Sequence, residues 1–195
     1  MRIYEATNGK GLELTLSPDR NGDITRLRYK GINMSYFSPC GYVAPAYYDK
    51  TGSNWLQSFT AGFLTTCGLQ AVGTPCTDDG EELPLHGSIA NQPCAHSYWD
   101  ENEKEIRIHS VTKDEVIFGR KLVLKRTVTI SKEENTFSID DHIHKSEMHD
   151  SICGIKDIDM DGKFVAIKMH FGELGNMAFL RPNYAKVVAD LCKEQ

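Results

Sequence analysis

The segment from residue 62 to residue 93 holds the side chains best suited to chemistry in this 195-residue chain. It contains the run Leu64-Thr65-Thr66-Cys67-Gly68-Leu69 and, further on, Leu85-His86-Gly87. Glycines let the backbone come close to a ligand, and a neutral imidazole both donates and accepts hydrogen bonds. Such loops on a β scaffold are common places for ligand sites. His86 is therefore a candidate site residue, with a purely structural histidine as the alternative.

A second group of chemically capable side chains comes later, and it suits a divalent metal. On a strand, His142 and His144 point to the same face, and two imidazoles with a carboxylate can bind a metal. The spacing matches no known metal motif, so we favour a polar strand end and predict no metal. The full group is Asp140, His142, His144, Glu147 and His149.

Residues 157–162 begin like a calcium-binding loop. Lys168 stands where that loop needs glutamate, so the sequence favours a solvated turn.

The composition narrows the class of protein. Hydrophobic residues make up 40% of the chain, enough for a core, and the length allows one domain or two small ones. The net charge of −5 argues against a nucleic-acid partner. No apolar run reaches the ~18 residues of a membrane span, and no signal-peptide pattern occurs at the start. The six cysteines form no C-x-x-C pair, so the usual structural zinc site is not indicated and we expect no cofactor. Without a secretory signal, we expect a cytoplasmic protein with reduced thiols.

Alternating apolar and polar residues predict the elements that must position these side chains. Turn-forming clusters separate the segments, which is typical of antiparallel hairpins. Residues 1–143 are therefore predicted to be mainly β, as a sandwich. The clearest predicted strands are residues 11–17, 24–30, 95–99, 105–112, 120–131 and 136–143.

The pattern changes after His144. Residues 163–169 form a short, nearly continuous apolar run, which predicts a buried strand. A glycine-containing loop follows, and Pro182 then introduces helical spacing of apolar residues to the end of the chain. We expect a second region at residues 144–195 with a short β-loop-α tail.

The first region resembles the aldose 1-epimerase (galactose mutarotase-like) family over roughly residues 5–143. The resemblance rests chiefly on Leu64-Thr65-Thr66-Cys67-Gly68-Leu69 combined with Leu85-His86-Gly87. Further matching residues are Asn8, Gly9, Gly11, Leu12, Pro18, Asp19, Arg20, Asp23, Ile24, Ser38, Pro39, Gly41, Trp55, Leu56, Phe59, Gly62, Gly73, Ile89, Asn91 and Pro93. This resemblance implies a partial β-supersandwich whose ligand is a small-molecule sugar.

The resemblance also implies roles for individual residues. His86 would be the catalytic acid or hydrogen-bond donor in the sugar cleft. Interconversion of anomers needs one group that takes the C1 hydroxyl proton and another that protonates the ring oxygen. The predicted substrate-binding residues are Arg20, Tyr47, Thr66, His86 and Asn91.

Two departures from the family pattern bear on activity. Ser88 follows His86-Gly87 where this branch usually has arginine, so a charged sugar contact is expected to be missing. A second histidine and a late carboxylate are not found after the strand at residues 136–143. We therefore expect anomer interconversion to be impaired by truncation. The alternative is a non-catalytic sugar-binding protein or an inactive chimeric remnant.

The second region resembles the start of an uncharacterised iron–sulfur (ferredoxin-type) family over residues 150–195. The matching stretch runs from Val165 through His170-Phe171-Gly172 to Arg181-Pro182. The cysteine clusters of such proteins are absent from the sequence, so no cluster is implied. A sandwich that is only partly present would leave strand edges open, and we expect self-association through them.

Overall fold

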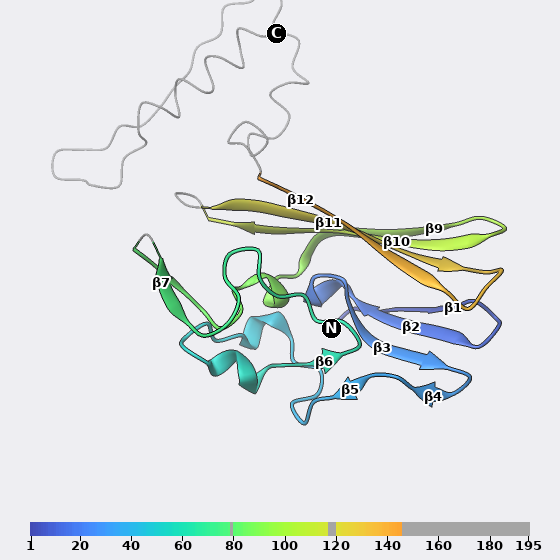
Figure 1. Ribbon diagram of the computed structural model, residues 1–195, viewed down its shortest axis with the longest axis horizontal. Coiled ribbons are helices and arrows are strands. Elements are labelled where there is room, and N and C mark those ends of the chain that lie inside the picture. Colours follow the sequence, from blue (N-terminus) through green and yellow to red (C-terminus); the bar gives the residue numbers. More distant parts are fainter. Residues whose placement is uncertain (79, 117–119, 146–195) are drawn as a thin grey trace, which may run out of the picture. The chain divides into compact units, whose positions relative to one another are not determined.

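The computed structural model describes residues 1–78, 80–116 and 120–145 (Figure 1). The chain divides into two compact units, Met1–Lys145 and Ser146–Gln195, and every described residue belongs to the first. The predicted β-loop-α tail and the calcium-like loop at 157–162 lie outside the described residues. The last described strand ends at Lys145, just past the predicted boundary at residue 143.

The first sheet has four antiparallel strands in the order β1-β2-β3-β4. They are β1 (Tyr4–Thr7), β2 (Leu12–Ser17), β3 (Asp23–Tyr29) and β4 (Ile32–Asn33). Leu12, Leu14 and Leu16 are buried because alternate residues of a strand share one face. The predicted strands at 11–17 and 24–30 are confirmed, whereas β1 was not predicted separately.

The second sheet is also antiparallel, in the order β12-β11-β10-β9. Its strands are β9 (Cys94–Glu101), β10 (Glu105–Glu115), β11 (Lys121–Ser131) and β12 (Phe137–Lys145). The side chain of Asn102 accepts hydrogen bonds from the backbone N–H groups of Lys104 and Glu105, which closes the β9–β10 turn. The predicted strands at 95–99 and 105–112 thus form an antiparallel hairpin.

The core lies where the two sheets face each other. Ile108, Val128 and Ile130 of the second sheet pack against buried leucines and isoleucine of the first. Burying each such side chain contributes roughly 1.5–3 kcal/mol of transfer free energy. The core residues are Leu12, Leu14, Leu16, Ile24, Leu27, Ile108, Val128 and Ile130. The prediction of a mainly β, antiparallel sandwich is confirmed.

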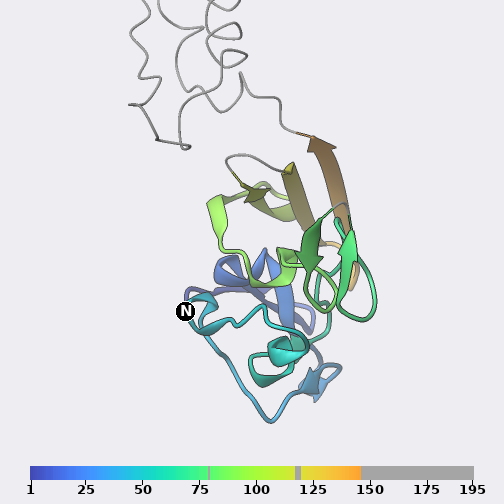
Figure 2. The ribbon, with the colours of Figure 1, turned by 90° about the vertical axis from the view of Figure 1, so that its left-hand side faces the viewer.

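A long connection between the two sheets carries most of the predicted site residues (Figures 1 and 2). The sequence predicted no regular strand in residues 62–93, but the structure has a short hairpin there, β7 (Cys76–Asp78) with β8 (Glu81–Leu83). The remaining elements are β5 (Tyr36–Phe37), β6 (Ala61–Gly62) and the 3₁₀ turns η1 (Pro18–Arg20), η2 (Pro45–Tyr47), η3 (Asn54–Gln57) and η4 (Ile89–Asn91).

The outer strands of the second sheet, as described, are β9 and β12. Ile139 and Ile143 lie on the same face of β12 as the inward residues of β11, yet they remain 36% and 55% exposed. Self-association through such edges stays a prediction. Among the described residues, no helix is long and apolar enough to cross a membrane.

Candidate functional site

His86 sits in a strained turn that its neighbours hold in place. Its backbone φ is 58°, a left-handed value that residues with a Cβ adopt rarely and often at functional positions. Its N–H donates to the carbonyl of Gly73 at 3.0 Å, and its own carbonyl accepts from the N–H of Gly68 at 2.9 Å. The backbone of this half-buried residue is thus bonded on both sides.

The ring of His86 is also fixed. The N–H of Gly73 donates to Nδ1 at 3.0 Å, so Nδ1 is unprotonated and the neutral ring carries its proton on Nε2. The Trp55 indole and the imidazole pack nearly perpendicular to each other, with ring centroids 5.6 Å apart. His86 therefore presents Nε2–H as a hydrogen-bond donor.

The glycine after His86 is required by close backbone packing. Gly87 has φ of 76°, and a Cβ there would lie 2.8 Å from the carbonyl oxygen of Gly68. Since that oxygen belongs to backbone, it could not simply rotate away. The Leu-His-Gly motif and the Cys-Gly-Leu motif are therefore adjacent in space, and each fixes the other.

Ser88 belongs to a polar network that ties this loop to the second sheet. Its hydroxyl donates to the buried carboxylate of Asp114 on β10 at 3.0 Å, and Gln70 Nε2 donates to the same carboxylate at 2.8 Å. Arg120, just before β11, places Nη2 3.3 Å from both Ser88 Oγ and Asp114 Oδ1, and Nη1 pairs with Glu81. Arg120 thus brings a guanidinium to Ser88 from elsewhere in the chain, while the expected lack of a charged sugar contact stays a prediction.

Thr66 lies in a separate, buried charge network. Its hydroxyl and N–H both donate to Oδ1 of Asp23, at 2.6 and 3.0 Å. Arg126 Nη1 approaches the same oxygen at 3.3 Å and donates to Thr66 Oγ1 at 2.8 Å, while its Nε and Nη2 bind Asp141 at 2.7 Å each. Burial raises the pKa of Asp23 to about 6, against the opposing effects of Thr66 and Arg126.

Arg20 and Asn91, both predicted to bind substrate, contact each other. Nη1 of the buried Arg20 donates to Oδ1 of Asn91, and its other nitrogens donate to the carbonyls of Val43 and Ser58. Burial lowers the pKa of this guanidinium. The cavity beside Arg20 measures only about 10 Å³, room for about one water rather than a sugar.

The five predicted site residues are not all joined by direct contacts with one another, although Arg20 and the partners of Thr66 and His86, Asp23 and Trp55, line the same small cavity. Arg20 and Asn91 pair with each other, Thr66 joins Asp23 and Arg126, and His86 packs on Trp55. Tyr47 is 77% exposed on η2. Their binding roles stay predictions.

Sequence reasoning missed the charged residues that hold these loops. Arg126 alternates with the buried Leu124 and Val128 along β11, so it lies on the same inward face. Asp114 lies on the same face of β10 as the buried Thr112. A charged residue in an inward series is a usable signal, because such a group is rarely buried without a partner.

The predicted histidine group is only partly described. His142 Nε2 lies 3.4 Å from Asp140 Oδ1 on the exposed face of β12, whereas Glu147 and His149 lie outside the described residues. In the part of the chain that the structure covers, no group of three or more His, Cys, Asp or Glu side chains could hold a metal.

Comparison with known proteins places the chain in a family. Residues 1–151 match the family described as "Domain of unknown function (DUF4432)". The chain belongs to this family. No curated protein matches the DUF4432 chain. The resemblance of residues 150–195 to an iron–sulfur family finds no support in these comparisons.

One solved structure resembles the DUF4432 chain. It is described as a "putative aldose 1-epimerase" from Klebsiella pneumoniae subsp. pneumoniae MGH 78578, with 28% sequence identity and a TM-score of 0.62. The match covers 71% of this chain and 38% of the Klebsiella chain, so the DUF4432 chain spans well under half of that protein's length. The likeness supports the epimerase sandwich fold that the sequence resemblance implied.

Proposed function

We propose that this chain is a carbohydrate-binding protein of aldose 1-epimerase type, with the sugar held at the loops around His86. The observation that carries the proposal is the hydrogen bond from Gly73 N–H to His86 Nδ1. It orients the ring and leaves Nε2–H as a donor to a sugar oxygen. The likeness to the Klebsiella structure supports a sugar as the ligand class.

The surroundings of His86 favour a polyhydroxylated ligand. Ser88, two residues after His86, donates a hydrogen bond to the carboxylate of Asp114. Gln70 and Arg120 both contact the Ser88 hydroxyl. Such a mixture of amide, hydroxyl, carboxylate and guanidinium groups can pair with both the donor and acceptor sides of sugar hydroxyls.

Anomer interconversion is the finer form of the proposal. In the ring as it stands, Nε2–H donates a hydrogen bond to the ring oxygen; to protonate that oxygen, His86 must first become an imidazolium, whose Nδ1 no longer accepts from Gly73, and a second group must take the C1 hydroxyl proton. The alternative is binding without turnover. Polarimetry on freshly dissolved galactose and glucose separates the two.

Binding itself is tested by titrating galactose and glucose into the full chain and following the bound sugar by NMR. Losing one hydrogen bond worth about 0.5–1.5 kcal/mol should weaken affinity about threefold to tenfold in His86→Ala. His96→Ala, which changes an exposed histidine on β9, is the matched control and should bind like the unchanged chain. Equal affinity in His86→Ala and the unchanged chain would overturn the proposal.

A further inference from the structure

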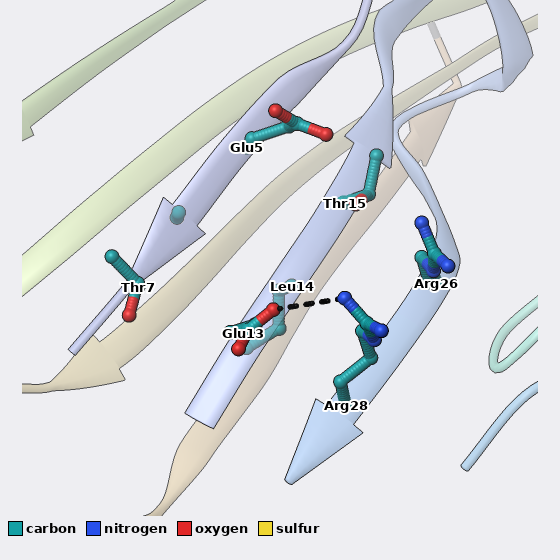
Figure 3. Close-up of a pocket in the computed structure, with 8 residues that line it drawn as sticks. Glu5, Thr7, Glu13, Leu14, Thr15, Arg26 and Arg28 are labelled. Carbon is teal, nitrogen blue, oxygen red and sulfur yellow. Dashed lines mark ion pairs between the residues drawn. The ribbon is translucent and has the colours of Figure 1, made fainter. Parts of the chain in front are cut away.

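A cavity of about 430 Å³ opens on the outward face of the first sheet, and no residue of the loops around His86 lines it (Figure 3). Three neighbouring strands each contribute two polar side chains to it. The strand register aligns them in two rows that cross the sheet, one with Glu5, Thr15 and Arg26, the other with Thr7, Glu13 and Arg28.

The two rows differ in how their charges are neutralised. Glu13 and Arg28 are opposite each other across β2 and β3 and form an ion pair at 3.5 Å. Arg26 instead faces Thr15, so no carboxylate is its direct cross-strand neighbour. Within the described residues, Arg26 forms no ion pair, and its buried Nε has no hydrogen-bond partner.

The guanidinium of Arg26 is nevertheless held in place. Its central carbon lies 5.6 Å from the centre of the Phe37 ring, a cation–π geometry. The hydroxyl of Thr15 and the carboxylate of Glu5 continue the row beside it. Arg26 is thus a pre-oriented cation at the edge of a polar cavity, and its Nε–H still lacks a hydrogen-bond acceptor.

We propose that this cavity binds a small hydroxylated oxyanion, such as a sugar phosphate or a sugar acid. A planar guanidinium takes a phosphate or carboxylate through two parallel hydrogen bonds, which is the role we assign to Arg26. Glu5 and Thr7 then accept hydrogen bonds from the ligand's hydroxyls. The volume lies in the range of small-molecule sites.

The test uses the full chain labelled with ¹⁵N and four probes: glucose 6-phosphate, glucuronate, glucose and inorganic phosphate. We expect glucose 6-phosphate, glucuronate or both to shift the backbone amide signals of β1–β3, and the one that does so identifies the oxyanion. Arg26→Gln should weaken that binding about tenfold to hundredfold, the cost of losing a hydrogen bond to a charged group. Arg107→Gln, which removes an arginine from the second sheet, is the control and should leave it unchanged.

Three results would overturn the proposal: neither sugar anion shifts these signals, Arg26→Gln binds as tightly as the unchanged chain, or inorganic phosphate alone binds as well as glucose 6-phosphate. A thermal melt of Arg26→Gln checks that the sheet is intact. Arg26→Lys keeps the positive charge but cannot form two parallel hydrogen bonds, so it should bind with intermediate affinity. His86→Ala should not change this site, so its outcome is independent of the proposed sugar site.

Discussion

Arg126 and Asp23 form an ion pair between the two sheets, with Nη1 and Oδ1 3.3 Å apart and both side chains almost fully buried. Thr66 adds two hydrogen bonds to the same carboxylate oxygen, and Asp141 binds the far side of the guanidinium. This arrangement joins β3, the loop after β6, β11 and β12. It gives the sandwich a polar link in addition to its apolar core.

The buried carboxylate of Asp23 should make stability depend on pH. Its pKa is about 6 in the folded chain and 3.8 as the ordinary value, so the folded state holds the proton more tightly. The stabilisation from that proton is complete below about pH 4 and is lost as the pH rises through about 6. Relative to Asp23→Asn, the free energy of unfolding of the unchanged chain should fall by up to about 3 kcal/mol between pH 4 and 7.

Urea unfolding of both proteins across this pH range measures the difference. Asp78→Asn, a change at an exposed aspartate of β7, is the control and should not alter the pH profile. A difference between the unchanged chain and Asp23→Asn that stays constant with pH would contradict the prediction.

Removing the cation of this pair should be more damaging than removing its outer anion. Arg126→Met leaves a buried, uncompensated carboxylate, which costs about 3–5 kcal/mol. Asp141 is 34% exposed, so Asp141→Asn should cost much less. The double variant Asp23→Asn/Arg126→Met should recover part of the loss, and chemical denaturation of all three provides the measurement. A double variant less stable than Arg126→Met would be evidence against the pairing.

The strand pattern of the sequence was sufficient for most of the sandwich, including the strand that holds Leu124, Val128 and Ile130. It could not reveal the partner of Arg126, because Asp23 lies 103 residues earlier and the two meet only through sheet-on-sheet packing. Which polar groups face each other across a core depends on register and sheet angle rather than on local periodicity.

For the candidate site, too, the sequence could indicate individual residues but not the contacts between distant segments. His86 could be singled out from its glycine-rich context, but its left-handed φ and the bond to Gly73 depend on a loop closure from residue 68 to residue 86. Arg120 and Asp114 escaped notice since they lie where β10 ends and β11 begins, in a hairpin that looks purely structural in the sequence. Their role appears only when Ser88 is placed beside them.

Gly62 should tolerate substitution far less than Gly31. Both have a positive φ, but a Cβ at Gly62 would lie 2.7 Å from the carbonyl oxygen of Ile24, whereas Gly31 has nothing within 4 Å. Gly31→Ala therefore carries only the left-handed strain of about 1–2 kcal/mol. Gly62→Ala adds a backbone clash and should lower the melting temperature clearly more. Equal melting temperatures for the two variants would contradict the tight contact between β6 and β3.

The tautomer of His86 can be observed directly. With Nδ1 accepting from Gly73, the ring should show a protonated Nε2 and an unprotonated Nδ1 in ¹⁵N NMR near neutral pH. Binding of a sugar should shift the Nε2 signal more than the Nδ1 signal, because only Nε2–H is a donor to the ligand. A ring protonated on Nδ1 would exclude the hydrogen bond on which the proposed function rests.

The edge of β12 should drive association of the chain with itself. Its outer side has no neighbouring strand within the described residues, and Ile139 and Ile143 stay exposed along it. An open, partly apolar strand edge is a template for another strand, and a lysine on such an edge opposes pairing. Ile143→Lys should therefore shift sedimentation profiles towards the monomer over a series of protein concentrations. Ile32→Lys places the same charge on the two-residue strand β4, at a residue that is at least as exposed as Ile143. It should have a smaller effect because so short an edge offers few backbone groups to pair. A chain that is monomeric at every concentration, or equal effects of the two lysines, would show that β12 is not the associating edge.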